Sequence, residues 1–229
     1  LVELANKSRE AISDDLFSVF TSMFDQKNRL FSKVRGGSIA NEDGVTSLIK
    51  ALDAVENVNP SIKGTPQLET QLQNLLNLRK PKTKTEVNAK GESVQRLETE
   101  EEVVERLVKY FAKSTGRRQD DLDLGYFYRE IRPQLAQMVD SILGPTGPVR
   151  KDAAGPMRSF IDYIDSEMDA LADAGNMTGT SAREAMDYYK ETYKPIWGDS
   201  PLQELHDLYR KTSVVTKSGK PAVEPASLA

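Results

Sequence analysis

Cysteine is absent from this chain of 229 residues, and histidine occurs once, as His206. Without cysteine the chain has no disulfide, no thiolate zinc site and no thiol nucleophile. One imidazole cannot build a multi-histidine metal site, and no Gly-x-Ser-x-Gly turn is present for it to serve as the base of a serine triad. The sequence therefore predicts neither a metal nor a cofactor.

Long apolar runs are also lacking. No stretch approaches the roughly 18 apolar residues that a membrane-spanning helix requires, so we expect no transmembrane segment. No basic region followed by an apolar stretch marks a signal peptide. The formal net charge of -4 excludes a global basic field that would recruit nucleic acid. The chain starts at Leu1 rather than Met, which indicates a processed product or a piece of a longer protein.

The sequence also lacks complete motifs for phosphate and calcium binding. Neither G-x-x-x-x-G-K-[ST] nor G-x-G-x-x-G occurs, and Arg35-Gly36-Gly37-Ser38 is better explained as the end of a helix. The acids of Asp121-Leu122-Asp123-Leu124-Gly125 lack the third ligand position and the final glutamate of an EF-hand. An acidic first turn of a helix explains them better.

One dipeptide, Glu92-Ser93, matches the start of lytic transglycosylase active sites. A general acid of that kind needs an apolar cleft that raises its pKa. Glu92 instead lies among Lys90, Gly91 and Arg96, in the most polar stretch of the chain. We therefore expect a protein without enzymatic activity.

Apolar residues that recur at helical spacing are the main positive feature of the sequence. They predict an all-α fold, an irregular assembly of about eight helices with long amphipathic members and one polar linker or small hairpin. The helices are expected over residues 2–34, 43–58, 66–78, 99–115, 122–143, 153–174, 181–197 and 201–211.

Helix boundaries follow from local signals. Gly36, Gly37 and Gly175 are predicted to end helices, because glycine accepts the left-handed conformation of a C-cap. Thr99 with Glu102 forms a capping box, as does Ser181 with Glu184. Pro133 is expected to kink or split the helix that contains it.

The polar segment 80–97 is the predicted boundary between an N-terminal helical region (1–79) and a C-terminal helical domain (98–213), with an extended tail at 214–229. The segment is either a solvated linker or a small hairpin that turns near Lys90-Gly91. Four basic residues at its start could make weak phosphate contacts with DNA, although no aromatic residues lie between them for base stacking. These residues are Arg79, Lys80, Lys82 and Lys84.

Aromatic residues gather on two predicted helices. The first carries a phenylalanine stripe, and the seventh carries large rings at positions i, i+4 and i+8. Large amphipathic rings suit both a core and a protein interface, so core packing and an assembly interface remain alternatives. The candidate interface residues are Phe17, Phe20, Phe24, Tyr189, Tyr193 and Trp197.

The segment Ala185-Met186-Asp187-Tyr188-Tyr189-Lys190-Glu191-Thr192-Tyr193-Lys194-Pro195-Ile196-Trp197-Gly198, with the predicted helix at 201–211, resembles a segment of the large internal virion (ejection) proteins of tailed bacteriophages. That family has helices of the type Ala-x-x-Tyr-Tyr/Phe-x-x-x-Tyr-x-Pro. The match covers the Ala185–Lys211 region. The resemblance implies a protein that is packaged in the capsid and expelled before or with the genome.

The resemblance further implies a structural role in a conduit that helps DNA cross the host envelope. The expected partners are further copies of the chain and other virion proteins, with transient, non-specific DNA contact. The expected location is the virion and then the host cell envelope. Two alternatives remain: a cytoplasmic helical adaptor that binds proteins through the Phe17–Phe31 stripe, and a non-catalytic domain of a large phage enzyme.

Overall fold

Helices make up most of the described chain, which confirms the predicted all-α class. The computed structural model describes residues 2–58, 66–114, 122–143, 151–197, 213–215 and 221–223. Its helical elements are α1 (Val2–Ser32), α2 (Glu42–Val58), α3 (Pro66–Arg79), α4 (Glu100–Ser114), α5 (Leu124–Tyr126), η1 (Phe127–Ile131), α6 (Arg132–Leu143), α7 (Lys151–Asp173), α8 (Met177–Tyr188), η2 (Tyr189–Tyr193) and α9 (Lys194–Trp197). The strands are β1 (Thr83–Val87), β2 (Ser93–Leu97), β3 (Ser213–Val215) and β4 (Pro221–Val223).

The chain divides into two compact units. The first joins Leu1–Ser32 with Arg183–Ala229, and the second is Lys33–Ala182. The predicted boundary at 80–97 instead lies inside the second unit. Helices from both sides of that segment share one core, because α2 packs against α7. A boundary based on composition alone could not detect this pairing of distant helices.

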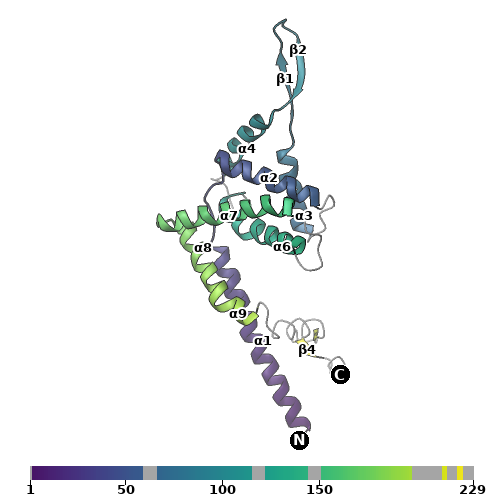
Figure 1. Ribbon diagram of the computed structural model, residues 1–229. Helices are drawn as coiled ribbons and strands as arrows, with labels where there is room; N and C mark the ends of the chain where they lie inside the picture. The colour runs from purple at the N-terminus through teal and green to yellow at the C-terminus, as the bar shows by residue number, and fades with distance from the viewer. Residues whose placement is uncertain are drawn as a thin grey trace. The chain divides into compact units, whose positions relative to one another are not determined.

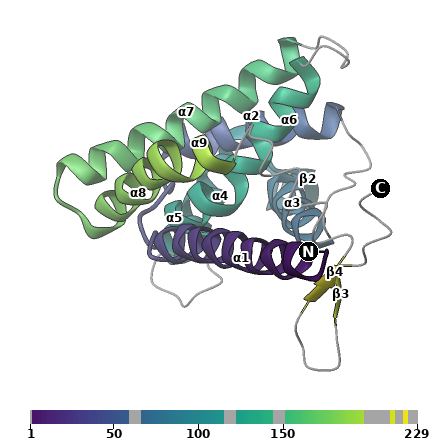
Figure 2. The same ribbon diagram turned by 90° about the horizontal axis from the view of Figure 1, so that it is seen from below.

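The core of the second unit forms around α7, which lies against both α2 and α6 (Figures 1 and 2). Each helix contributes an apolar face at helical spacing, as the sequence predicts. The buried residues of α7 include Met157, Phe160, Ile164 and Met168, and those of α2 include Val45, Leu48, Leu52 and Val55.

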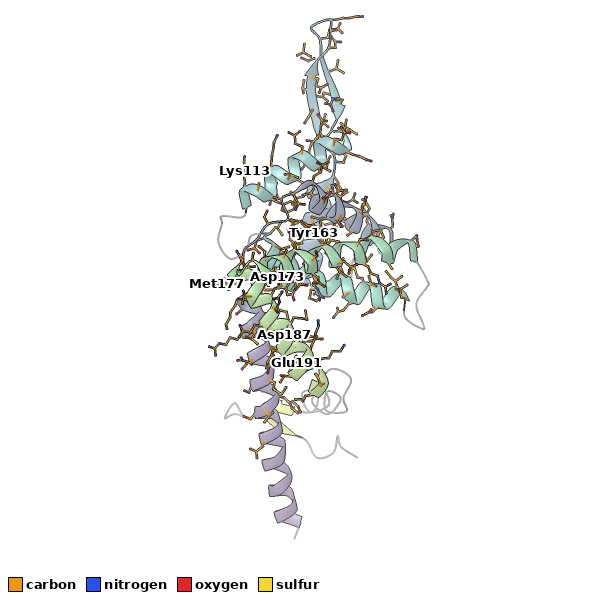
Figure 3. All side chains as sticks on the ribbon, turned by 60° about the vertical axis from the view of Figure 1, so that its left-hand side comes forward. Lys113, Tyr163, Asp173, Met177, Asp187 and Glu191 are labelled. Atoms are coloured by element: carbon orange, nitrogen blue, oxygen red, sulfur yellow. The ribbon has the colours of Figure 1, made fainter. Side chains whose placement is uncertain are left out.

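A chain of aromatic rings runs through this core. Phe127 makes edge-to-face contacts with Phe111 of α4 and Phe160 of α7, at centroid distances of 5.9 and 5.8 Å. Phe160 stacks on Tyr163, whose hydroxyl accepts a hydrogen bond from Asn41 Nδ2 at 2.9 Å. Tyr163 is labelled on α7 in Figure 3. The rings therefore connect three helices and the start of α2.

Two π-helical turns, η1 and η2, each precede a proline. In η1 the Arg132 N–H donates to the Phe127 carbonyl, and in η2 the Lys194 N–H donates to the Tyr189 carbonyl. Each bond spans five residues, and Pro133 or Pro195 follows at once. Proline has no N–H and its ring clashes with the carbonyl four residues earlier, so a wider turn lets the helix continue. Where a kink or a split was predicted at Pro133, the helix runs on from Leu124 to Leu143 through a π-helical turn.

The segment that follows α1 is tied to the start of α5. Gly36 and Gly37 have φ values of 88° and 78°, which confirms the predicted helix end. Asp123 caps α5 by accepting from the Tyr126 N–H at 2.6 Å, and it also accepts from the Gly36 N–H at 2.7 Å. The acidic stretch before α5 is therefore a helix N-terminus, as predicted.

Helix α8 begins at Met177, four residues before the predicted Ser181. Asn176 is its cap, since the Asn176 Oδ1 accepts from the Thr178 N–H at 2.9 Å. Gly175 ends α7 as predicted, with φ of 70° and with the Asn176 N–H donating to the Leu171 carbonyl. The missing Cβ of Gly179 allows α8 to approach the backbone of α7 closely.

The 80–97 segment forms the small hairpin rather than a linker. Strands β1 and β2 pair antiparallel, with Thr85 opposite Gln95, and Gly91 occupies the turn with φ of 81°. Within the predicted extended tail, β3 and β4 also pair antiparallel. The predicted helix at 201–211 lies outside the described residues.

Across the described ranges, no helix is both long enough and apolar enough to cross a lipid bilayer.

Candidate assembly surfaces

The aromatic cluster of the first unit lies where α1 packs against η2. Tyr189 and Tyr193 stack with their centroids 5.8 Å apart, and the Lys27 Nζ lies over the Tyr193 ring at 5.0 Å from the centroid. Lys27 also lies 4.6 Å from the centroid of the Phe24 ring. The ammonium group is thus held between rings contributed by two segments that are far apart in sequence.

Burial shifts the pKa of two side chains in this cluster. Desolvation lowers the pKa of Lys27, because a partly buried ammonium group loses hydration. Desolvation also raises the pKa of Tyr193, with smaller contributions from Tyr189 and Tyr188. The Tyr193 side chain therefore stays neutral near pH 7, and its ring face can attract the Lys27 cation.

The predicted interface residues do not form one exposed surface. Phe20 and Tyr193 are buried, at 6% and 7% exposure, whereas Phe24 is 45% exposed and Tyr189 is half-buried. The side chains of Phe17 and Trp197 lie outside the described residues. Packing within the chain therefore uses part of the aromatic set, and Phe24 remains at the surface.

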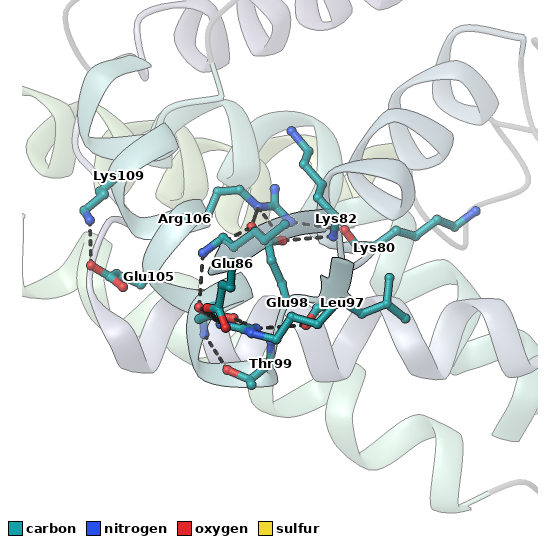
Figure 4. Close-up of polar contacts among 12 residues, drawn as sticks. Lys80, Lys82, Glu86, Leu97, Glu98, Thr99, Glu105, Arg106 and Lys109 are labelled. Atoms are coloured by element: carbon teal, nitrogen blue, oxygen red, sulfur yellow. Dashed lines mark hydrogen bonds and ion pairs between the residues drawn. The ribbon is translucent and has the colours of Figure 1, made fainter. Parts of the chain in front are cut away.

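A second candidate surface is the base of the β1–β2 hairpin (Figure 4). There the buried Glu98 and its partner Arg106 connect the hairpin to α4 and to the end of α3. The Glu98 carboxylate is 3% exposed and accepts from the Lys82 N–H at 3.0 Å. Arg106 of α4 donates from Nε to the same carboxylate, at 3.0 and 3.2 Å. Arg106 also donates to the carbonyls of Leu78 and Lys80, which places the hairpin at the end of α3.

Glu102 forms the second part of this network. The capping box is confirmed, since the Thr99 N–H donates to Glu102 at 2.9 Å and the Glu102 N–H donates to Thr99 Oγ1 at 3.3 Å. Arg96 donates to both Glu102 oxygens, at 2.6 and 2.8 Å. Lys84 donates to Glu102 at 3.2 Å.

These contacts keep the carboxylates ionised. The hydrogen bond from Arg96, followed by that from the Thr99 backbone, holds the pKa of Glu102 well below its usual range. The Lys82 backbone and then Arg106 lower the pKa of Glu98, and Arg96 lowers the pKa of Glu86. The base of the hairpin is thus a charge-paired joint that fixes the strands to α4.

The four basic residues predicted for DNA contact have different environments. Arg79 is bound to Asp53 at 2.5 Å and to Glu56, and it belongs to the packing of α3 on α2. Lys84 is paired with Glu102, while Lys80 and Lys82 are exposed beside the joint. The basic run in the sequence therefore does not form one continuous positive surface.

Composition alone did not indicate Glu98, Arg96 or Arg106 as site residues. Each looks like an ordinary surface charge in the sequence. An available signal was the alternation of Lys84, Glu86 and Arg96 along two short β-prone segments. Their connection to α4 depends on the register of the hairpin, which the sequence does not specify.

Within the described ranges, no group of three or more histidine, aspartate or glutamate side chains is placed to hold a metal ion. Glu92 is exposed at the hairpin turn and accepts a hydrogen bond from Asn88 Nδ2 at 2.9 Å. A shallow open hollow along α1 is lined by polar side chains, namely Ser18, Thr21, Ser22, Asp25, Gln26 and Arg29.

Comparisons of the chain with protein-family models, curated proteins and solved structures gave no match.

Proposed function

We propose that this chain is a non-enzymatic bacteriophage virion protein of the ejection class, which self-assembles and assists genome delivery across the host envelope. The observation that carries the proposal is the segment resembling such proteins, Ala185–Gly198. Its tyrosines and proline build a π-helical turn that packs against α1. The segment thus acts as a structural contact between helices, as a conduit subunit requires.

Two further observations support a structural role. The helix α1 is 31 residues long, and most of its described side chains are exposed. A long helix with a large free surface suits packing against neighbouring subunits. The absence of cysteine also means that no disulfide would obstruct unfolding during passage through a narrow tail.

An adaptor that binds partners through the phenylalanine stripe of α1 is less well supported. Such an adaptor needs the stripe at its surface, but Phe20 and Leu30 are 6% and 4% exposed. Part of the stripe is thus already covered within the chain.

Quantitative mass spectrometry of purified phage particles tests the proposal. We expect the chain in full particles and its depletion from particles that have been triggered to eject their DNA. The major capsid protein is the control, because it stays with emptied particles. A chain that is abundant in infected cells but absent from full particles would overturn the proposal.

A further inference from the structure

The β1–β2 hairpin has one charged and one uncharged face. Alternation along the strands places Lys84, Glu86, Val94 and Arg96 on the face that joins the network with Glu102. The other face, which we call the uncharged face, consists of Thr83, Thr85, Val87, Ser93, Gln95 and Leu97.

The uncharged face is open to solvent. All six of its residues are exposed, and Val87 and Leu97 reach 70% and 63% exposure. The hairpin projects away from the helices of the same unit, to which its charged face is bound at the base (Figure 3). Three β-branched residues and one leucine are thus exposed on this face, while the charged residues of the two strands lie on the opposite face.

The residues of β1 on this face leave their backbone groups unpaired at the outer edge of the hairpin, whereas on β2 the Leu97 carbonyl accepts from Arg96 Nη1 at 2.9 Å. The Glu98 N–H donates to the Lys82 carbonyl, and the Asn88 N–H donates to the Glu92 carbonyl, both at 2.9 Å. Alternation along an antiparallel ladder therefore points the N–H and C=O groups of Thr83, Thr85 and Val87 outward. Within the described ranges, this sheet has two strands and no third strand covers either edge.

We propose that β1 pairs with β1 of a second copy of this chain, antiparallel across a two-fold axis at Thr85. The pairing would give a four-stranded sheet, and it rests on the self-assembly included in the proposed function. Thr85 would lie opposite Thr85 of the second copy, and Thr83 opposite Val87. Such pairs of β-branched side chains stabilise a sheet.

Charge complementarity selects this edge and this partner. The same register places Lys84 of each copy opposite Glu86 of the other. These two pairs of opposite charges would extend the ion pairs that Lys84 and Glu86 already make with Glu102 and Arg96 within each chain. The equivalent pairing of β2 around Gln95 would place Arg96 opposite Val94, with no charge gain. An isologous contact of this kind also uses one patch twice, as a closed dimer requires.

Cysteine substitution in the full-length chain tests the pairing, because the natural sequence has no cysteine. Residues opposite each other in a hydrogen-bonded pair have Cα atoms about 5.5 Å apart, which suits a disulfide. We expect Thr85→Cys to form a disulfide-linked dimer rapidly with oxidised glutathione. Gln95→Cys is the matched control, since Gln95 lies opposite Thr85 on the other edge, and it should cross-link slowly.

Proline substitution gives a second, independent measurement. Thr85→Pro removes an outward N–H but no bond inside the hairpin, and it should weaken self-association in sedimentation velocity by about tenfold or more. Gln95→Pro, the matched control, should self-associate like the natural chain. Circular dichroism should show unchanged helix content for both variants.

Equal cross-linking of the two cysteine variants, or equal self-association of the two proline variants, would overturn the β1 pairing. If the chain is nevertheless present in full particles and leaves with the DNA, the proposed function stands without this contact. If Thr85→Cys cross-links selectively but the chain is absent from particles, the pairing stands and the proposed function fails.

Discussion

At the scale of single residues, glycine is required at several positions because the backbone of another segment lies too close for any side chain. Gly125 is one example, since a Cβ there would lie 2.7 Å from the Val34 carbonyl oxygen and 2.8 Å from the Arg35 Cα. Gly44 is another, because its Cβ would lie 2.8 Å from the Ile39 carbonyl oxygen. Neither requirement is visible in sequence, where these glycines look like helix-weakening residues.

Gly179→Ala should destabilise the protein by about 1–3 kcal/mol, because overpacking forces backbone to move. A Cβ at this position would lie 2.2 Å from the Ala172 nitrogen and 2.6 Å from the Met168 carbonyl oxygen. Both atoms belong to the backbone of α7, so a side-chain rotation cannot relieve the contact. Urea denaturation followed by circular dichroism gives the free energy of unfolding.

Thr180→Ala is the control for this change. Thr180 is the next residue of α8, its side chain is exposed, and alanine should alter stability by less than about 0.5 kcal/mol. Equal stabilities of the two variants would contradict the close approach of α8 to α7.

At the scale of elements, the hairpin and α4 are joined by ion pairs that depend on pH. The carboxyl groups of Glu86, Glu98 and Glu102 all have a lowered pKa in the folded chain. A lowered folded pKa contributes stability above the unfolded value of 4.5 and loses it as pH falls through the folded pKa. The joint should therefore stabilise the protein at neutral pH and weaken progressively below about pH 4.5.

Glu102→Gln tests this joint. Glutamine preserves the capping box, but it removes the charge that binds Arg96 and Lys84. The variant should be less stable than the natural chain at pH 7, and the difference should shrink as the pH is lowered toward 2. Thermal unfolding at a series of pH values measures it. Glu100→Gln, also in the first turn of α4 but exposed, is the control, and an identical pH profile for both variants would contradict the predicted joint.

The two π-helical turns share a sequence pattern. The sequences Tyr126-Phe127-Tyr128-Arg129-Glu130-Ile131-Arg132-Pro133 and Tyr188-Tyr189-Lys190-Glu191-Thr192-Tyr193-Lys194-Pro195 share two leading aromatic residues, a buried apolar or aromatic residue and a basic residue before proline. In both, the wider turn comes directly before the proline and its basic neighbour. Proline inside an amphipathic helix predicted a disruption, and the structure shows which kind.

At the scale of the whole molecule, the chain does not divide at the polar segment 80–97, as its composition predicts. One compact unit is Lys33–Ala182, and the other joins the two ends of the chain. A fragment of residues 33–182 should unfold cooperatively, because α2, α6 and α7 share one core within it. A fragment of residues 1–79 should not, since α2 would lose the apolar surface of α7. Thermal circular dichroism compares the two fragments, with the full chain as the control. Cooperative unfolding of residues 1–79 would instead support the boundary at 80–97.

Local patterns in the sequence determined the all-α class, most helix bounds and the capping box at Thr99. They did so because helical periodicity, glycine ends and caps act over a few residues. They also identified the aromatic helix at 189–197. For segment 80–97 they left two alternatives, a solvated linker and the small hairpin that the structure contains. Only the tertiary structure decided which aromatic rings are buried, how α2 meets α7 and which charges bind Glu98 and Glu102. Those outcomes depend on segments brought together from distant parts of the chain, where spacing along the sequence carries no information.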